Sequence, residues 1–230
     1  AAEDCPPAEA ILDGFVEATG SADAYRAVKS KIMTATFEIP AQGVSGTLTI
    51  YHARPKLFRS TVEIPGIGTI DRGIAGDVAW ESSMMTGPQI KEGPEKIEMM
   101  RDADFDAIWN WRDIVEKAEC TGLDTIEGTP CWRVEIAFKE GSPRTQFFDV
   151  ETNLVVATSS VLETQMGKVP LMAYESDYAD FGGIKQAKVT RIVVMGQDRF
   201  IKLTKVEYDV EMPEGIFDLP ADVKALVTEE

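Results

Sequence analysis

Apolar and polar residues alternate over most of the chain from Lys31 to Val210, and short turn sequences divide this alternation into runs. In "IMTATFEI", residues 32–39, the apolar Met33, Ala35 and Phe37 alternate with threonine and glutamate. A period of two puts successive side chains on opposite faces of a strand, so that one face is apolar and the other is wet. The chain must therefore fold largely as antiparallel strands whose apolar face needs a cover.

The turns between the runs set the expected architecture. They divide the alternation into about 10 or 11 strands without a domain break, which predicts one α+β domain. We expect a single antiparallel sheet curled into an unclosed half-barrel, with helices over its concave face. The expected segments are N-terminal helices over 1–30, a first meander over 31–86, a helical lid over 87–113, a second meander over 114–212 and an acidic segment over 213–230.

Charge restricts the partners of the chain. Its formal net charge is −16, and the stretch from Glu207 to Glu230 holds eight acids and one lysine. Such a surface repels phosphate backbones, so we expect no nucleic-acid partner, and we expect a monomer.

The first residues, "AAEDCPP", resemble the sequence left after a signal peptide is cleaved at small residues. This predicts an exported, periplasmic protein, in solution or associated with the outer membrane. A lipid anchor on Cys5 is disfavoured, because Asp4 precedes it where a small residue is usual.

Two of the three cysteines flank a predicted hairpin turn. If the strands pair around residues 125 and 126, Cys120 and Cys131 lie close together, which predicts a disulfide between them. The alternative is that both are small buried hydrophobes.

Methionine and aromatic side chains gather around the expected lid. Flexible thioethers and flat rings adapt to ligands of variable shape, which favours a hydrophobic cavity, although the same stripe could be plain core. A wide one-sided sheet with few helices to fill it supports the cavity. The candidate cavity residues are Phe37, Leu48, Ile50, Phe58, Val62, Trp80, Met84, Met85, Met99, Met100, Phe105, Ile108, Trp109 and Trp111.

Acidic residues in the lid raise the question of a metal site. Asp102, Asp104 and Asp106 have the spacing of a calcium loop, but Ala107 stands where that loop needs glycine, and Asp113 where it needs glutamate. We therefore interpret these acids as helix-start and solvent-facing residues, and expect neither a metal nor a cofactor.

Signals for catalysis are sparse. The one histidine, His52, has no nucleophile motif near it, and a lone histidine is usually structural. Glu175 and Asp177 would share a face of a strand, as a glycosidase pair does, but nothing else marks them out.

Several motifs in order resemble one family. They are "ATGSADAYRAVKS", "ARPKLFRS", "GDVAW", "DVETNLVVA", "DYADFGGIKQAKV" and "VEMPEGIFDLP". Together they resemble the bacterial outer-membrane lipoprotein-sorting proteins of the LolA and LolB-like superfamily, although Ser21 and Ala187 replace a usual glycine and proline. The resemblance implies a non-catalytic periplasmic carrier with an unclosed barrel, a helical lid and a cavity for lipoprotein acyl chains or other lipids.

Three functions therefore remain open. The first is a carrier of lipid or lipoprotein acyl chains that meets membrane-associated donor and acceptor proteins. The second is an envelope interaction module with a packed core and no ligand. The third is a hydrolase that depends on His52.

Overall fold

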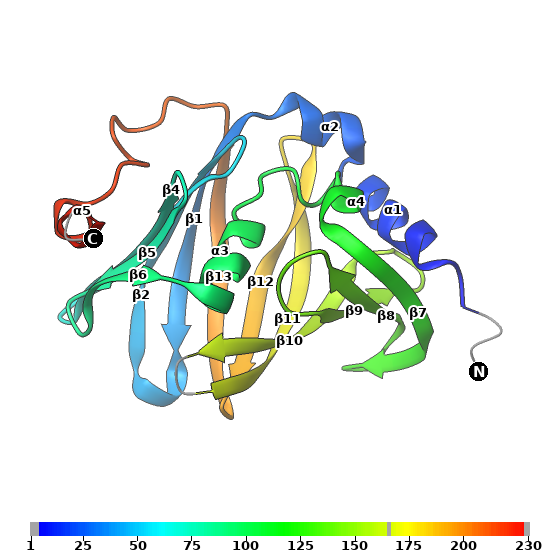
Figure 1. Ribbon diagram of the computed structural model, residues 1–230. Helices are drawn as coiled ribbons and strands as arrows, with labels where there is room; N and C mark the ends of the chain where they lie inside the picture. Colours follow the sequence, from blue (N-terminus) through cyan, green and yellow to red (C-terminus); the bar gives the residue numbers. More distant parts are fainter. Residues whose placement is uncertain (1–4, 165–166, 228–230) are drawn as a thin grey trace.

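One antiparallel sheet of 13 strands dominates the computed structural model, which describes residues 5–164 and 167–227. The strand order is β6-β5-β4-β3-β2-β1-β13-β12-β11-β10-β9-β8-β7, so that nearly all neighbours are also consecutive in the chain. Figure 1 shows the sheet curled into an open barrel. The expected α+β class and the single unclosed sheet are confirmed.

The strands are bounded by the turns that punctuate the sequence. The first six are β1 (Ser30–Ile39), β2 (Val44–Ala53), β3 (Leu57–Ile64), β4 (Gly68–Ala75), β5 (Val78–Ser83) and β6 (Gly87–Lys91). The other seven are β7 (Val115–Ile126), β8 (Thr129–Phe138), β9 (Arg144–Asp149), β10 (Val155–Thr164), β11 (Gly167–Phe181), β12 (Ile184–Val194) and β13 (Gln197–Tyr208).

The helices are α1 (Ala8–Thr19), α2 (Ser21–Ala27), α3 (Gly93–Asp102), α4 (Trp111–Ile114) and α5 (Ala221–Val227), with a 3-10 turn, η1 (Pro40–Gln42). Within the part of the chain that the structure describes, none of these helices is long and apolar enough to cross a membrane. The expected count of about 10 or 11 strands was too low. One reason is that Gly87–Lys91, expected within the lid, pairs with β5 as an edge strand.

The two edges of the sheet are joined by one connection. β6 and β7 follow each other in the chain but lie at opposite edges, and α3 and α4 lie between them in the sequence. Figure 1 shows α3 inside the curve of the sheet. Met99 and Met100 on α3 pack against Ile74 and Ala79 of the first meander. The lid is therefore a crossing of the concave side that starts and ends at the sheet edges.

The N-terminal helices cover the other half of the concave side. α1 buries Ile11, Leu12 and Val16 against strands of the second meander, including Phe148. Each such side chain contributes about 1.5 to 3 kcal/mol when it leaves water. α1 is thus held by burial, and it fixes the position of α2.

The C-terminal segment covers part of the outer face. α5 packs on β6, where Val223 is fully buried, and Ser82 donates a hydrogen bond to Asp222. Trp80 stands directly opposite Gly73, with the Arg59 guanidinium 5.4 Å from its ring centroid. Its neighbour Ala79 faces inward, so alternation places Trp80 on the outer face, away from the concave side where the sequence had suggested it.

The disulfide joins Cys5 to Cys120, with their Cα atoms 6.0 Å apart, and Cys131 is a buried free thiol. The expected Cys120–Cys131 pair was wrong because the turn lies later than assumed, at Glu127 and Gly128, whose φ angles of 48° and 90° suit a tight hairpin. Cys120 therefore stands opposite Val134, well away from Cys131. Residues 1–4, on which the expectation of export partly rests, lie outside the described residues.

Breaking the disulfide should destabilise the fold. The bond closes a loop with a sequence separation of 115, and in the chain-entropy view such a bond contributes about 2 to 5 kcal/mol. We expect Cys5→Ser to lower the free energy of unfolding in urea by about this amount. Reductant should lower the stability of the wild type and leave Cys5→Ser unchanged. A peptide map under non-reducing conditions that links Cys131 to either partner would contradict this pairing.

Candidate functional site

A row of paired residues crosses the inner face of the sheet at its α2 end. Lys31 on β1 stands directly opposite Tyr208 on β13 and opposite His52 on β2, and His52 stands opposite Phe58 on β3. Directly opposed residues of antiparallel strands point to the same face. The row therefore brings an amine, an imidazole and a phenol side by side beneath the helices.

The first hollow, the α1/α2 cavity, has a volume of about 230 Å³ and lies between this row, the two N-terminal helices and β11 and β12. Its walls combine rings and alkyl groups with a few polar groups. The lining residues are Phe15, Tyr25, Val28, Lys31, Met33, Phe105, Ile108, Glu175, Tyr178, Ile184, Lys185, Gln186, Ala187, Thr190 and Tyr208.

The second hollow, the α3 cavity, has a volume of about 350 Å³ and lies over the other end of the row, at His52 and Phe58. It shares Lys31, Met33, Phe105 and Ile108 with the α1/α2 cavity, so the two adjoin. The other lining residues are Ile50, His52, Phe58, Arg101, Asp102, Asp104, Ala107, Ile114, Phe138 and Arg144.

The loop over residues 103–110 separates and covers the two cavities. Asp106 anchors it, because the carboxylate accepts hydrogen bonds from Arg54 Nε and from Trp109 Nε1, each at 2.8 Å. Arg54 also donates to the backbone carbonyls of Tyr25 and Arg26 at the end of α2. One guanidinium thus joins the sheet, α2 and the loop that carries Phe105 and Ile108.

His52 is held in its neutral form. Its ring Nε2 lies 2.9 Å from the carbonyl oxygen of Ala103, which can only accept, so Nε2 carries the proton. Burial, together with the smaller effect of the positive charge of Lys31, lowers the pKa of His52 to about 4. The imidazole also lies edge-on to Phe105, with ring centroids 4.9 Å apart. These contacts give His52 a structural role under the loop.

Lys31 carries a desolvated amine. Loss of water lowers the pKa of Lys31 to about 8, so the amine is mostly charged at neutral pH. Its Nζ lies 5.4 Å from the ring centroid of Phe105. The amine therefore sits beside the aromatic wall that the two cavities share.

Glu175 and Tyr178 form the polar end of the α1/α2 cavity. Tyr178 Oη lies 2.6 Å from a Glu175 oxygen and 3.0 Å from the carbonyl oxygen of Val155. Burial raises the pKa of Glu175. A protonated Glu175 carboxyl group would donate its hydrogen to Tyr178 Oη, and Tyr178 would then donate its own hydrogen to the carbonyl oxygen of Val155. Asp177, at a φ of 54°, breaks the alternation and is exposed, so the expected Glu175 and Asp177 pair does not form.

The structure distributes the candidate cavity residues over four places. Ile50, Phe58, Phe105 and Ile108 line the two cavities. Leu48, Val62, Met99, Met100, Trp109 and Trp111 pack in core clusters, and Met100 also lines a shallow hollow beside α3. Phe37, Met84 and Met85 line a separate hollow at the hairpin tips, and Trp80 is on the outer face.

The sequence pattern placed Met33 on the apolar face of its strand, but neither Met33 nor Lys31 was among the candidate cavity residues that it suggested. Both continue the inward register of Ala35 and Phe37 toward the start of β1. Lysine was not considered for an apolar face, because a charge there normally costs stability. Tyr25, Tyr178 and Tyr208 come from elements far apart in sequence, and only the sheet order brings them together.

Asp102, Asp104 and Asp106 act in ion pairs and do not start a helix, whereas Asp102 is exposed as expected and Asp113 is exposed in the first turn of α4. Asp102 ends α3 and lies 2.7 Å from Arg144, Asp104 lies 3.7 Å from Lys56, and Asp106 is paired with Arg54. Among the residues that the structure describes, no group of three or more metal-ligating side chains comes together.

Solved structures share this architecture. A LolA superfamily protein from Nitrosomonas europaea superposes with a TM-score of 0.61 at 9% identity, over 94% of this chain and 99% of that one. The chain has the LolA-like fold. A DUF1329 family protein from Desulfovibrio piger matches with a TM-score of 0.61 at 16% identity, over 93% and 98% of the two chains.

A third structure with the LolA-like fold is a domain from Vibrio parahaemolyticus described as an outer membrane lipoprotein-sorting protein. It gives a TM-score of 0.54 at 10% identity, over 90% of this chain and 97% of that one. Neither a protein-family model nor a curated protein sequence matches the chain.

Acid should destabilise the protein partly through His52. Because the folded pKa of about 4 is below the ordinary 6.5, the unfolded state binds a proton first as the pH falls. The stability that depends on neutral His52 is fully present above pH 6.5 and is lost as the pH falls from 6.5 to 4, by about 3 kcal/mol. We expect urea unfolding of His52→Gln to lose this part of the pH dependence. Identical pH profiles for the two proteins would contradict it.

Proposed function

We propose that this protein is a periplasmic carrier that holds acyl chains or another hydrophobic ligand between its sheet and its helices, without covalent chemistry. The observation that carries the proposal is the pair of adjoining cavities, of about 230 and 350 Å³. Ligand sites in proteins are typically hollows of roughly 300 to 1,000 Å³ with mostly apolar walls and a few polar groups. The two cavities together fit that description.

Unfilled space under a sheet has a thermodynamic cost. Each apolar side chain that does not reach a packed neighbour forgoes part of the roughly 1.5 to 3 kcal/mol that full burial contributes. A ligand that fills the space supplies the missing contacts and stabilises the folded state by mass action. Two hollows remain where the covering helices and loop meet the sheet, which favours a cavity with a function.

The likeness to the LolA superfamily protein and to the lipoprotein-sorting domain also supports a carrier. On this proposal Ile50, Phe58, Phe105 and Ile108 contact the ligand, and the core residues Leu48, Val62, Met99, Trp109 and Trp111 hold the walls in place. Mass spectrometry of organic extracts from natively purified protein should find a lipid. A protein without extractable lipid that also binds no added amphiphile would contradict the proposal.

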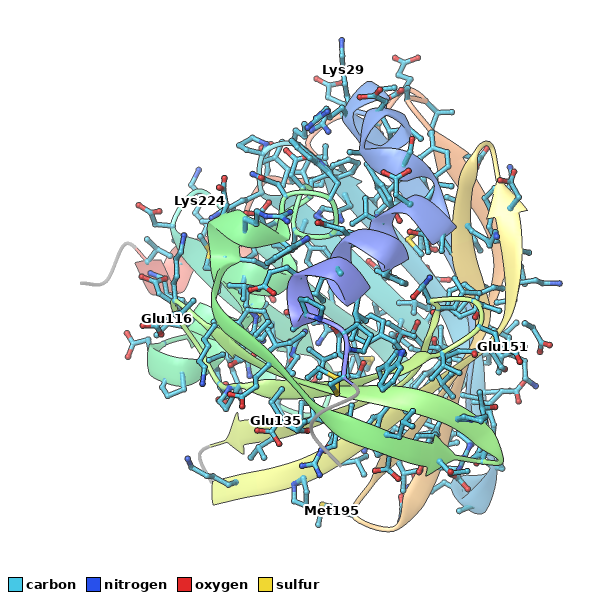
Figure 2. All side chains as sticks on the ribbon, turned by 90° about the vertical axis from the view of Figure 1, so that its right-hand side faces the viewer. Lys29, Glu116, Glu135, Glu151, Met195 and Lys224 are labelled. Atoms are coloured by element: carbon cyan, nitrogen blue, oxygen red, sulfur yellow. A yellow bond between two sulfur atoms is a disulfide. The ribbon has the colours of Figure 1, made fainter. Side chains whose placement is uncertain are left out.

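Docking of a membrane-associated donor or acceptor protein is a second candidate, and exposed side chains at the hairpin tips favour it. Met84 and Met85 are 80% and 83% exposed at the β5–β6 turn, and Ile67 is exposed at the β3–β4 turn. Large apolar side chains that gather on a surface mark many interaction sites. Carboxylates such as Glu116, Glu135 and Glu151 project from the surface in Figure 2, which disfavours nucleic acid as a partner.

Filling the cavities from one wall should prevent binding. Met33 lines both cavities, so the larger ring in Met33→Trp should occupy ligand space and weaken binding of N-phenyl-1-naphthylamine, a neutral fluorescent probe, by at least roughly tenfold. The matched control is Met195→Trp. Met195 is 80% exposed at the β12–β13 turn, far from Lys29 and the α2 end (Figure 2). Equal probe affinity in both variants would contradict a ligand site at Met33.

Loosening the loop should speed the release of ligand. Asp106→Ala removes the acceptor of two hydrogen bonds, one of them from a guanidinium, and such bonds contribute about 1 to 3 kcal/mol. We expect the dissociation rate of the same probe in stopped flow to rise roughly 3- to 10-fold. The control is Asp23→Ala, which removes an exposed ion pair with Arg26. An unchanged dissociation rate would show that the loop does not retain ligand.

A further inference from the structure

Lys31 places a positive charge at the boundary between the two cavities. Its strand neighbours Tyr208 and His52 flank it on the inner face, and its Nζ faces the ring of Phe105. His52 is neutral above its pKa of about 4 and cannot balance the charge. The amine therefore lies beside the Phe105 ring and near a neutral imidazole, and the strand next to it carries a phenol.

No carboxylate neutralises this amine. Among the residues that the structure describes, none lies within 4.0 Å of Lys31 Nζ. The nearby acids are engaged elsewhere: Asp102 with Arg144, Asp104 with Lys56 and Asp106 with Arg54. Glu175, which lines the same α1/α2 cavity as Lys31, is hydrogen-bonded to Tyr178. Lys31 is half-buried, and a desolvated charge without a carboxylate partner costs stability, so its position beside apolar walls points to an external anion.

Tyr208 offers a second donor in the α1/α2 cavity, on the strand next to Lys31. Gln186 Nε2 donates to Tyr208 Oη at 2.7 Å, so the hydroxyl accepts that bond and its own hydrogen remains to be donated. Burial raises the pKa of Tyr208 to about 12, which keeps the hydroxyl protonated at neutral pH. An ammonium and a hydroxyl on neighbouring strands can together hold one carboxylate or phosphate oxygen group.

We propose that Lys31 and Tyr208 bind the anionic head group of a single-chain amphiphile, such as a fatty acid, whose alkyl chain lies along Met33, Phe105 and Ile108. This inference rests on the proposed carrier function and names its ligand class. These contacts of the alkyl chain are inferred because Met33, Phe105 and Ile108 line both cavities. A single chain suits volumes at the lower end of the range of small-molecule sites.

The charge state of Lys31 gives the proposal a pH signature. In the ligand-free protein the amine of Lys31 has a pKa of about 8. Anion binding should therefore weaken above pH 8, because the amine loses its proton and its charge. Arginine at the same position would stay charged. The other titratable or charged groups that line the cavities or anchor the loop are His52, Tyr208, Tyr25, Glu175, Tyr178, Lys185, Asp102, Asp104, Asp106, Arg54, Arg101 and Arg144.

The test compares an acid with its neutral ester in delipidated full-length protein. Fluorescence titrations with cis-parinaric acid and with its methyl ester would be made on the wild type, Lys31→Met and Lys31→Arg, at pH 7 and pH 9.5. Met is similar in length and uncharged, and removal of an unpaired buried charge should leave the melting temperature equal or higher. Acetate and inorganic phosphate would be added as competitors.

We expect the wild type to prefer the acid, and Lys31→Met to lose roughly 10- to 100-fold in affinity for the acid with the ester unchanged. The acid affinity should fall at pH 9.5 in the wild type and persist in Lys31→Arg. If Lys31→Met does not fold, the comparison of acid affinity at pH 7 and pH 9.5 in the wild type and in Lys31→Arg is sufficient to test the proposal.

Several results would overturn the proposal. Equal binding of acid and ester by the wild type, or unchanged acid affinity in Lys31→Met, would overturn the anion site and leave the carrier standing. If acetate or inorganic phosphate displaced cis-parinaric acid at concentrations similar to that of the acid, Lys31 would belong to a site for small anions and not to a site for amphiphiles. Binding of neither acid nor ester would overturn the carrier as well.

Discussion

The structure depends on one constraint, which is that a wide antiparallel sheet must cover its concave face from within its own chain. The sheet is not closed, and its edges, β6 and β7, are consecutive in sequence, so the connection between them has to cross the concave side. That crossing supplies α3 and the loop over 103–110. The N-terminal helices cover the remaining part, and two adjoining cavities lie where these covers meet the sheet.

The polar groups of these cavities follow from strand register. Direct cross-strand pairing sets Tyr208, Lys31 and His52 in one row, and the loop closes over them through the Arg54 and Asp106 ion pair. His52 donates to a backbone carbonyl and stays neutral, whereas Lys31 keeps a charge without a carboxylate beside it among the described residues. A cavity wall that sets a cation without a carboxylate partner beside apolar side chains is chemically suited to an amphiphile with an acidic head.

Periodicity predicted the fold well because burial acts on every strand in the same way. The alternation in β1 and β2 identified inward residues such as Ile50, and the methionine and aromatic run from Met99 to Trp111 marked the cover. The same reasoning failed where one turn was misplaced. Moving the β7–β8 turn by two residues separates Cys120 from Cys131, and the bond forms with Cys5 instead.

The sequence by itself determined the single antiparallel sheet, its turns and the helical cover, because these follow from the local period of two, from turn residues and from the need to bury one face. Only the tertiary structure decided which inward residues meet. Trp80 left the candidate site because the register of β5 turns Ala79 inward and Trp80 outward, while Lys31 joined it because β13 and β2 flank β1. Local pattern assigns a side chain to a face of a strand, but the order of strands and the path of the covering segments determine its neighbours.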